Sequence, residues 1–287
     1  MERLVIVGPG RIGLSLGQAL IDADGVAGIL YQGRHPHPPD HPIFADPRVE
    51  YRYGVDRPGE GTTALLLTVP DHVLEAMSEL LSARGGPPPG TPALHCSGAL
   101  GAEPLGALHR VGYRVGTLHP LQAVANPATG ARRLLGASFA VSGEREALAA
   151  SRRIVASLGG EALTVPTQQR PRYHAAAVLA SNYVVVLLRA ATRLLVSTGT
   201  SEDEAERAVI ALARGTLENS AELGLDQALT GPVLRGDVDV VDLHMRSLPE
   251  RERRLYVALG REVLDEVSDD LSPDVLGALN LLMERYS

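Results

Sequence analysis

Lysine is missing from this chain, and all 27 of its basic side chains are arginines. No ammonium side chain is therefore present to act as a general acid, to form a Schiff base or to clamp a phosphate. Proton transfer and charge neutralisation must come from other side chains. Histidine is the residue whose ordinary pKa lies near neutrality.

Cysteine is almost absent, since Cys96 is the only one. A single cysteine excludes an internal disulfide and fits a reducing cytoplasm. The net charge of −7 argues against a nucleic-acid-binding surface. The sequence has no uninterrupted apolar run of membrane-spanning length and begins directly with a strand-like segment, so we expect a cytoplasmic protein without a leader or a membrane segment.

Three histidines, His35, His37 and His41, lie close together in the proline-rich segment GRHPHPPDHP. Clustered histidines suggest a metal site. Their spacing, however, fits no standard ligand pattern. We therefore expect no bound metal.

The most informative segment is LVIVGPGRIGLSLG, residues 4–17. Leu4–Val7 predicts a short buried strand, and the G-x-G-x-x-G spacing that follows opens an apolar-periodic helix. Glycines at these places allow a tight turn, the approach of backbone to a pyrophosphate, and close packing of helix on strand. The free N–H groups at the start of the helix favour phosphate. We expect the dinucleotide to contact Gly8, Gly10, Arg11, Ile12 and Gly13.

The second strand, VAGILYQGR at residues 26–34, bears on the choice of cofactor. NAD-specific domains place an acid at the end of this strand, where it binds the ribose 2′-hydroxyl. This chain has no acid there and places Arg34 next, whose guanidinium suits a 2′-phosphate. The sequence favours NADP, with a solvated arginine as the alternative.

Further strand-like runs alternate with helical patterns such as 73–83 and 145–158, which predicts an α/β fold with a mostly parallel, doubly wound sheet. Two segments, 33–42 and 85–92, are too rich in proline for either element and are expected to be loops. The predicted strands are Val49–Tyr53, Ala64–Val69, Ala93–Cys96, Arg114–Leu118, Ser138–Val141 and Ala162–Val165.

After Pro166 the pattern changes to helices alone. We expect a Rossmann domain over residues 1–166 and an all-helical domain over residues 167–287. The long apolar segment 175–196 is expected to be a buried core or dimer-interface helix. Further helices are predicted at 200–223, 249–267 and 273–286.

Ligands of open α/β sheets bind beyond the carboxyl ends of the strands, where three polar segments are expected. They are Thr68-Val69-Pro70-Asp71, His95-Cys96-Ser97-Gly98 and His119-Pro120-Leu121-Gln122. Val69 and Pro70 would flank the nicotinamide side of the cofactor. The helical domain adds Tyr173-His174 and Ser181-Asn182, which share one helix face.

Ser97, His119, His174 and Asn182 are the catalytic candidates, and each has a structural alternative. Ser97 could cap the next helix, and His119 could be held by backbone hydrogen bonds. His174 could cap or pack. Asn182 could satisfy buried polar groups only.

The motifs GPGRIG, TVPD, HCSGAL, LHPLQ, YHAAAVLASNY and LTGPVLRGD together resemble one family. It is the bacterial family of Rossmann-like proteins that carries domain of unknown function 2520. This family lies within the superfamily of 6-phosphogluconate dehydrogenase, pyrroline-5-carboxylate reductase and prephenate dehydrogenase. The resemblance implies an NADP-binding domain, an all-helical domain, a dimer formed through the helical part, and a site in the cleft between domains.

The relatives in this superfamily suggest further roles. Ser97 and His119-Pro120-Leu121 resemble a serine and histidine pair of prephenate dehydrogenases, but this chain has Ser181-Asn182 where those enzymes have Ser-His. Thr230-Gly231-Pro232 and Arg235-Gly236-Asp237 resemble in position a loop that completes the partner's pocket in pyrroline-5-carboxylate reductases. Several dehydrogenase families of this domain order also use a lysine from the first helix after the Rossmann domain, which this chain lacks.

We therefore expect an NADP-dependent oxidoreductase acting on a small carbonyl, imine or alcohol. Ser97 and Asn182 would orient the substrate, and His119 or His174 would exchange the proton that accompanies hydride transfer, with Tyr173 as a weaker donor. Two alternatives remain: a non-catalytic NADP-binding sensor or scaffold, and a prephenate or arogenate dehydrogenase-like enzyme.

Overall fold

One eight-stranded sheet organises the first part of the chain in a computed structural model that describes all residues, Met1–Ser287. The strand order is β3-β2-β1-β4-β5-β6-β7-β8, and every neighbouring pair is parallel except β6 with β7. From β1 the sheet grows to one side through β2 and β3, and to the other side from β4 onward. The point between β1 and β4, where the direction of strand addition changes, is the usual binding place for a dinucleotide in such sheets. The strands are β1 Glu2–Val7, β2 Val26–Gly33, β3 Val49–Tyr53, β4 Ala64–Leu67, β5 Pro92–His95, β6 Arg114–Pro120, β7 Ser138–Gly143 and β8 Glu161–Thr164.

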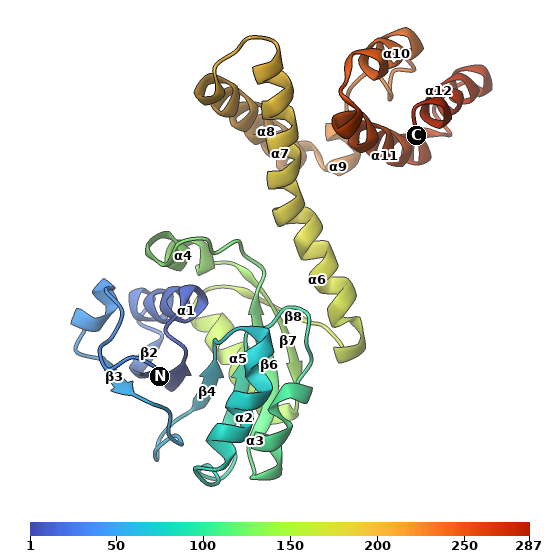
Figure 1. Cartoon of the computed structure of the whole chain (residues 1–287). Helices are drawn as coiled ribbons and strands as arrows, with labels where there is room; N and C mark the ends of the chain where they lie inside the picture. The colour runs from blue at the N-terminus through green and yellow to red at the C-terminus, as the bar shows by residue number, and fades with distance from the viewer. The chain divides into compact units, whose positions relative to one another are not determined.

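Helices cover both faces of this sheet, as Figure 1 shows. Successive residues of β1 point to opposite faces, so Leu4 and Ile6 pack in one core layer and Val5 and Val7 in the other. The first layer lies under α1 Arg11–Asp22, α4 Pro127–Leu134 and α5 Arg145–Ser157; the second lies under α2 Leu74–Ser82 and α3 Gly106–Arg110. The predicted doubly wound α/β sheet is confirmed.

The connection from β3 to β4, residues 54–63, contains no helix. The α2 and α3 layer therefore ends over the middle of the sheet. No helix of this connection covers the corresponding face of β2 and β3.

Beyond β8 the chain is helical to its end, as predicted. It runs through the short 3-10 turn Thr167–Gln169, α6 Arg170–Val178, a π-helical turn at Leu179–Tyr183, and α7 Val184–Ser197. Contacts divide the chain into a first unit, Met1–Ser181, and a second unit, Asn182–Ser287, so that the division falls within the π turn. The domain boundary at residue 166 stays a prediction.

The long apolar helix is not a core helix of this chain, which corrects one reading of the sequence. Among the residues of α6 and α7, only Arg170 and Ala190 are buried. The continuous helix Thr167–Ser197 is also long and apolar enough to cross a membrane by length and composition, although its apolar run is broken in the sequence. An apolar composition predicts that a helix face is covered, but it does not identify the covering surface.

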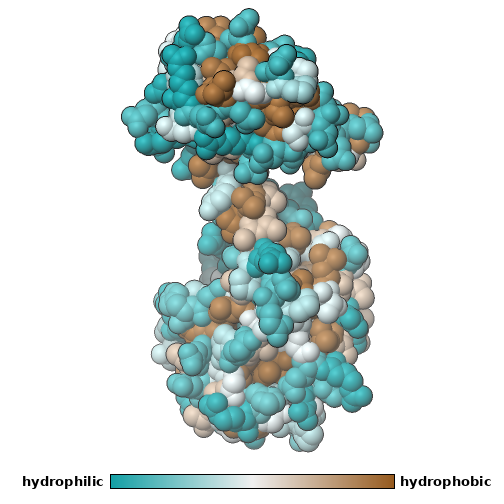
Figure 2. Space-filling view, turned by 90° about the vertical axis from the view of Figure 1, so that its right-hand side faces the viewer, coloured by the Kyte–Doolittle hydropathy of each residue, from teal (hydrophilic) through white to brown (hydrophobic).

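The second unit contains α8 Glu202–Leu223, α9 Leu225–Ala228, α10 Val238–Ser247, α11 Glu250–Val267 and α12 Pro273–Arg285. It has a modest core of its own under α10, α11 and α12. Arg193 of α7 binds Glu252 of α11 through two hydrogen bonds of 2.9 and 2.7 Å. Apolar side chains remain exposed on this unit, including Leu212 and Leu217 of α8, and Figure 2 shows apolar groups among hydrophilic ones on its surface.

Candidate functional site

The glycine loop between β1 and α1 has the geometry that its sequence predicts. Gly8 has φ +98°, and a Cβ there would lie 2.9 Å from Val69 Cγ1. A Cβ at Gly13 would lie 2.5 Å from the Gly8 carbonyl oxygen and from Thr68 Oγ1. Gly10, in contrast, faces open space, with nothing within 4 Å of an added Cβ. Two glycines thus allow close packing, and the third leaves room for a ligand.

The start of α1 is open to an anion. Gly10 is its N-cap residue and offers no side-chain cap, so the first N–H groups of the helix have no side-chain acceptor. Arg11 is exposed and Ile12 is half-buried at this end. Val69 and Pro70 come after Thr68, just beyond the end of β4, and Val69 lies next to Gly8 of the glycine loop.

Two side-chain hydroxyl groups fix the glycine loop by donating hydrogen bonds to its carbonyl groups. Thr68 Oγ1 donates to the Gly8 carbonyl at 2.6 Å, and Tyr31 Oη donates to the Gly13 carbonyl at 2.9 Å. Gly17 makes room for Tyr31, because a Cβ there would lie 1.8 Å from the phenol oxygen. The sequence pattern did not single out Tyr31, whose role depends on a contact between β2 and α1.

Arg34 lies just beyond the end of β2, as expected. Its side chain is exposed and its Nε–H donates to His35 Nε2 at 3.3 Å, so no acid neutralises it. Gln32 is fully buried, and its Oε1 accepts from the Asp56 N–H at 3.0 Å. The end of β2 therefore has a free guanidinium and no carboxylate for a ribose.

A second cluster lies at the carboxyl ends of β5 and β6 within the first unit. His119 Nδ1 and Tyr173 Oη are hydrogen bonded at 2.8 Å. The rings of His119 and His174 contact edge to face, with centroids 5.9 Å apart. A Cβ at Gly98 would lie 2.4 Å from His174 Nδ1 and 2.9 Å from His119 Nε2, so only glycine fits between them. The structure thus brings together two of the predicted catalytic residues.

Ser97 adjoins this cluster, but both hydrogen-bonding functions of its hydroxyl are in use. The hydroxyl donates to Asp71 Oδ2 at 2.7 Å and accepts from the Leu100 N–H at 3.2 Å. The bond from the Leu100 N–H resembles a helix cap, which is the structural role that the sequence analysis gave as the alternative for Ser97. Asp71 is exposed and begins the 3-10 turn Asp71–Val73 after β4; the sequence analysis did not name it as a catalytic candidate.

His95 is a structural residue of the same turn. Its Nδ1 accepts from the Ser97 N–H at 3.1 Å, which leaves Nε2 as the protonated nitrogen that donates to the Gly101 carbonyl at 2.5 Å. The ring is fully buried, and burial lowers the pKa of His95. A neutral His95 therefore fixes the backbone on both sides of Gly98.

Arg170 is the residue that sequence reasoning missed. It is fully buried at the start of α6, donates from Nη2 to the Ser97 carbonyl at 3.4 Å and lies 5.8 Å from the centre of the Tyr173 ring. Its Nε and Nη1, together with Nδ1 of His174, have no hydrogen-bond partner in the protein. Burial lowers the pKa of Arg170. Its place at the start of the first helix after the sheet was the only available sequence signal.

The electrostatics correct one expectation about His119. Burial, followed by the charges of Arg170 and His174, lowers the pKa of His119 to about 4. His119 is therefore neutral near pH 7 and does not titrate there. Burial raises the pKa of Tyr173, so its phenol keeps its proton at neutral pH.

Two predicted elements lie outside this cluster. Asn182 is the first residue of the second unit, and the loop containing Gly231 belongs to that unit too. The π turn that contains Asn182 is a rare element often found at functional sites. The roles of Asn182 and of this loop, and a cleft between the units, stay predictions.

No group of three or more histidine, cysteine or acidic side chains is arranged to hold a metal ion. Within the proline-rich loop, His41 Nδ1 accepts from the Ile43 N–H at 3.2 Å and caps a 3-10 turn. That histidine therefore has a structural role.

Solved structures show the same fold. A Thermotoga maritima protein, TM1727, is 23% identical, with a TM-score of 0.69 over 93% of this chain and 98% of its own. A Bacteroides fragilis protein described as an NADP oxidoreductase is 19% identical, with a TM-score of 0.65 over 92% and 98%. Pyrroline carboxylate reductase of Plasmodium falciparum, solved with NADP bound, is 13% identical, with a TM-score of 0.56 over 99% and 97%.

Sequence comparison identifies a family. No curated protein matches the chain. Residues 137–263 match the family model described as "Domain of unknown function (DUF2520)", a range that runs from β7 into α11 and follows the glycine loop. The match confirms, over residues 137–263, the resemblance to the DUF2520 family that the motifs indicated.

Proposed function

We propose that this protein is an NADP-dependent oxidoreductase that transfers a hydride to or from a small carbonyl, imine or alcohol. The observation that carries the proposal is the presence, in one unit, of an open dinucleotide loop and a half-buried, hydrogen-bonded His119–Tyr173 pair. Both lie at the carboxyl ends of neighbouring strands of one sheet, β1 and β4 for the loop and β5 and β6 for the pair. Two structural neighbours, one described as an NADP oxidoreductase and one a pyrroline carboxylate reductase solved with NADP bound, support it.

The cofactor contacts follow from the loop. The N–H groups at the start of α1 would bind the pyrophosphate beside Gly10, and Val69 and Pro70 would border the nicotinamide. Arg34, which has no acidic partner, would bind the 2′-phosphate and so select NADP over NAD. When bound, this cofactor supplies or accepts the hydride.

Tyr173 is the proton donor that the geometry favours over the histidines. Its phenol stays protonated at neutral pH, and its oxygen is hydrogen bonded to His119 Nδ1. As Tyr173 gives its proton to the product, a proton on His119 Nδ1 replaces it. His119 stays neutral by taking a proton from solvent at Nε2. The histidine thus acts as a relay between two neutral tautomers, which a pKa of about 4 permits.

Arg170 would stabilise negative charge in this site. Its guanidinium is buried behind the Ser97–Gly98 turn and next to Tyr173, where the low dielectric strengthens its field. Charge that develops on a substrate oxygen or nitrogen during reduction would be attracted to it. This arrangement supplies a cation without lysine.

Assembly is proposed to occur through the helical part. Leu179, Tyr183, Val185 and Val186 are each more than half exposed on the helix around the π turn. A homodimer that buries this apolar face is the assembly we propose for a cytoplasmic protein. Obligate interfaces of this kind bury upwards of about 2,000 Å².

The proposal is tested by NADPH consumption, followed by absorbance, with a panel of 2-keto acids, cyclic imines and small ketones. Oxidation of prephenate with NADP tests the prephenate dehydrogenase alternative in the same assay. Sustained turnover supports an enzyme. Binding of NADPH without turnover on any substrate would support the sensor or scaffold alternative instead.

A further inference from the structure

A cavity of about 690 Å³ lies in the first unit, away from both clusters described above. The β3–β4 connection has no helix to fill this space against the sheet. The cavity is therefore enclosed by strand residues on one side and by the loop residues 56–62 and Pro87–Pro89 on the other. None of the glycine-loop residues, Arg34 or the histidine cluster lines it. Its volume is in the range of small-molecule sites, about 300–1,000 Å³.

The floor of the cavity is set by the strand register. Val5, Leu30 and Glu50 are successive partners across β1, β2 and β3 and share one face of the sheet. Gly28, the partner of Arg3, also lines the cavity and deepens it because it has no side chain. Glycine in the middle of a strand often marks such a place of close approach.

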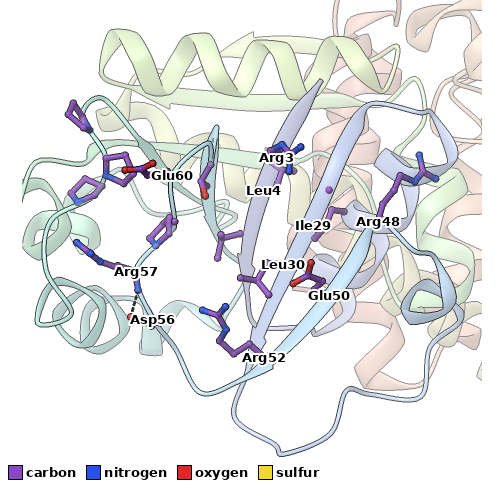
Figure 3. Close-up of a pocket in the computed structure, with 18 residues that line it drawn as sticks. Arg3, Leu4, Ile29, Leu30, Arg48, Glu50, Arg52, Asp56, Arg57 and Glu60 are labelled. Atoms are coloured by element: carbon purple, nitrogen blue, oxygen red, sulfur yellow. Dashed lines mark hydrogen bonds between the residues drawn. The ribbon is translucent and has the colours of Figure 1, made fainter.

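Three arginines from different segments line this cavity without an ionic partner in the chain: Arg3 of β1, Arg52 of β3 and Arg57 of the loop. Arg48, in contrast, is committed to Asp24 and Asp46 at 2.9 Å each. Figure 3 shows Arg57 on the loop side of the cavity and Arg52 on the strand side. Guanidinium groups of this kind bind phosphate or carboxylate in bidentate fashion.

Acidic groups line the same cavity, namely Glu50, Asp56 and Glu60. Asp56 accepts from the Arg57 N–H at 2.8 Å, whereas Glu50 and Glu60 form no ion pair in the structure. A bare anion would be repelled by these carboxylates. A ligand with hydroxyl or amino donors would satisfy them.

We propose that this cavity is a second ligand site, for a small organic anion that also carries hydroxyl or amino groups. Arg52 and Arg57 bind the phosphate or carboxylate, and Glu50 and Glu60 accept from the donors. The carbon body rests on Leu30 and the prolines, whose fixed φ angles keep the loop walls in place. This ligand is distinct from the cofactor and from the substrate of the proposed reduction.

Isothermal titration calorimetry on the full chain, saturated with NADP to block the glycine loop, tests this site. The probes are AMP, glucose 6-phosphate, citrate and glutamate, with inorganic phosphate as the bare anion. At least one organic probe should bind saturably, about tenfold or more tighter than phosphate. Absence of saturable binding by all four up to about 10 mM would overturn the proposal.

Two variants act on the site by different physical means. The double change Arg52→Gln and Arg57→Gln removes charge and should weaken the bound probe by about tenfold or more. Gly28→Val leaves the charge intact and places a side chain in the cavity. Its Cβ meets only the Arg48 carbonyl oxygen, at 3.5 Å, so the strand can accept it. It should weaken the same probe.

The matched control is Arg207→Gln, an exposed arginine on α8 of the second unit, which should leave probe affinity unchanged. Circular dichroism and retained NADPH affinity report on the folding of each variant. If one of the two cavity variants fails to fold, the probe affinity of the other one tests the proposal. Wild-type affinity in a folded variant, whether the double glutamine or the valine, would show that the probe binds elsewhere and would overturn the proposal.

Discussion

The phenol oxygen of Tyr173, on α6, lies 2.8 Å from Nδ1 of His119, near the end of β6. This bond joins residues 54 positions apart, from the sheet and from the first helix that follows it. Gly98 lies against the other nitrogen of His119, and Arg170 lies against the Tyr173 ring. The pair is therefore held by the fold on both sides, as a proton relay requires.

Gly98→Ala should disrupt this cluster. The new Cβ would lie 2.4 Å from His174 Nδ1 and 2.9 Å from His119 Nε2, so at least one ring must move. We expect a loss of about 1–3 kcal/mol in the free energy of unfolding, measured by urea denaturation. The control is Gly215→Ala on α8, where nothing lies within 4 Å of the added Cβ. Equal stability of the two variants would show that the histidines are not packed as described.

Arg34 should decide between the two nicotinamide cofactors. We expect wild-type protein to bind NADPH about tenfold to a hundredfold more tightly than NADH, because a salt link to the 2′-phosphate contributes about 1–3 kcal/mol. Arg34→Ala should remove most of this preference in a fluorescence titration. A preference that survives the substitution would mean that another group binds the 2′-phosphate.

The low pKa of His119 should make stability depend on pH. The folded protein holds this ring neutral down to about pH 4, whereas the unfolded chain protonates it near pH 6.5. Stability from this residue is therefore present above pH 6.5 and lost as pH falls toward 4, by up to about 3 kcal/mol.

His119→Gln isolates that contribution, because other titrating groups are common to both proteins. The difference in unfolding free energy between wild type and variant should shrink as pH falls from 7 to 4. Histidine NMR titration gives the pKa directly. A His119 resonance that titrates near pH 6.5 in the folded protein would refute the assignment.

The exposed helix face should hold two chains together. Val186, 53% exposed on α7, is expected to be buried in the dimer, so Val186→Asp should shift the protein to monomer in light scattering. Leu281→Asp, at an exposed position on α12, is the matched control and should remain dimeric. Wild-type protein that is monomeric at micromolar concentration would exclude the proposed assembly.

Local sequence patterns were sufficient for the fold and the glycine loop. Leu4–Val7, the glycine spacing and the following helix form a contiguous signal, and each glycine that the pattern requires has the predicted surroundings. The strand ends also predicted that Ser97 and His119 lie at one edge of the sheet, because parallel strands present their carboxyl ends together.

Features that depend on tertiary contacts were not predictable in this way. The burial of Arg170 and its contact with Tyr173 arise from the packing of α6 on the turn after β5. The lowered pKa of His119 follows from that packing. Val185 is exposed in the single chain, although its helix is apolar. Apolar composition predicts that such a helix is covered, but not whether the covering surface comes from the same chain or from another.

The most direct test of the proposed function is NADPH-dependent turnover by wild-type protein and by Tyr173→Phe. Phenylalanine keeps the ring beside Arg170 and removes only the hydroxyl that is bonded to His119. We predict turnover of a small carbonyl or imine by the wild type, a fall in kcat of about 10²–10⁴-fold in the variant, and nearly unchanged NADPH affinity. Turnover by Tyr173→Phe at the wild-type rate, or NADPH binding by the wild type without turnover of any substrate, would contradict the account.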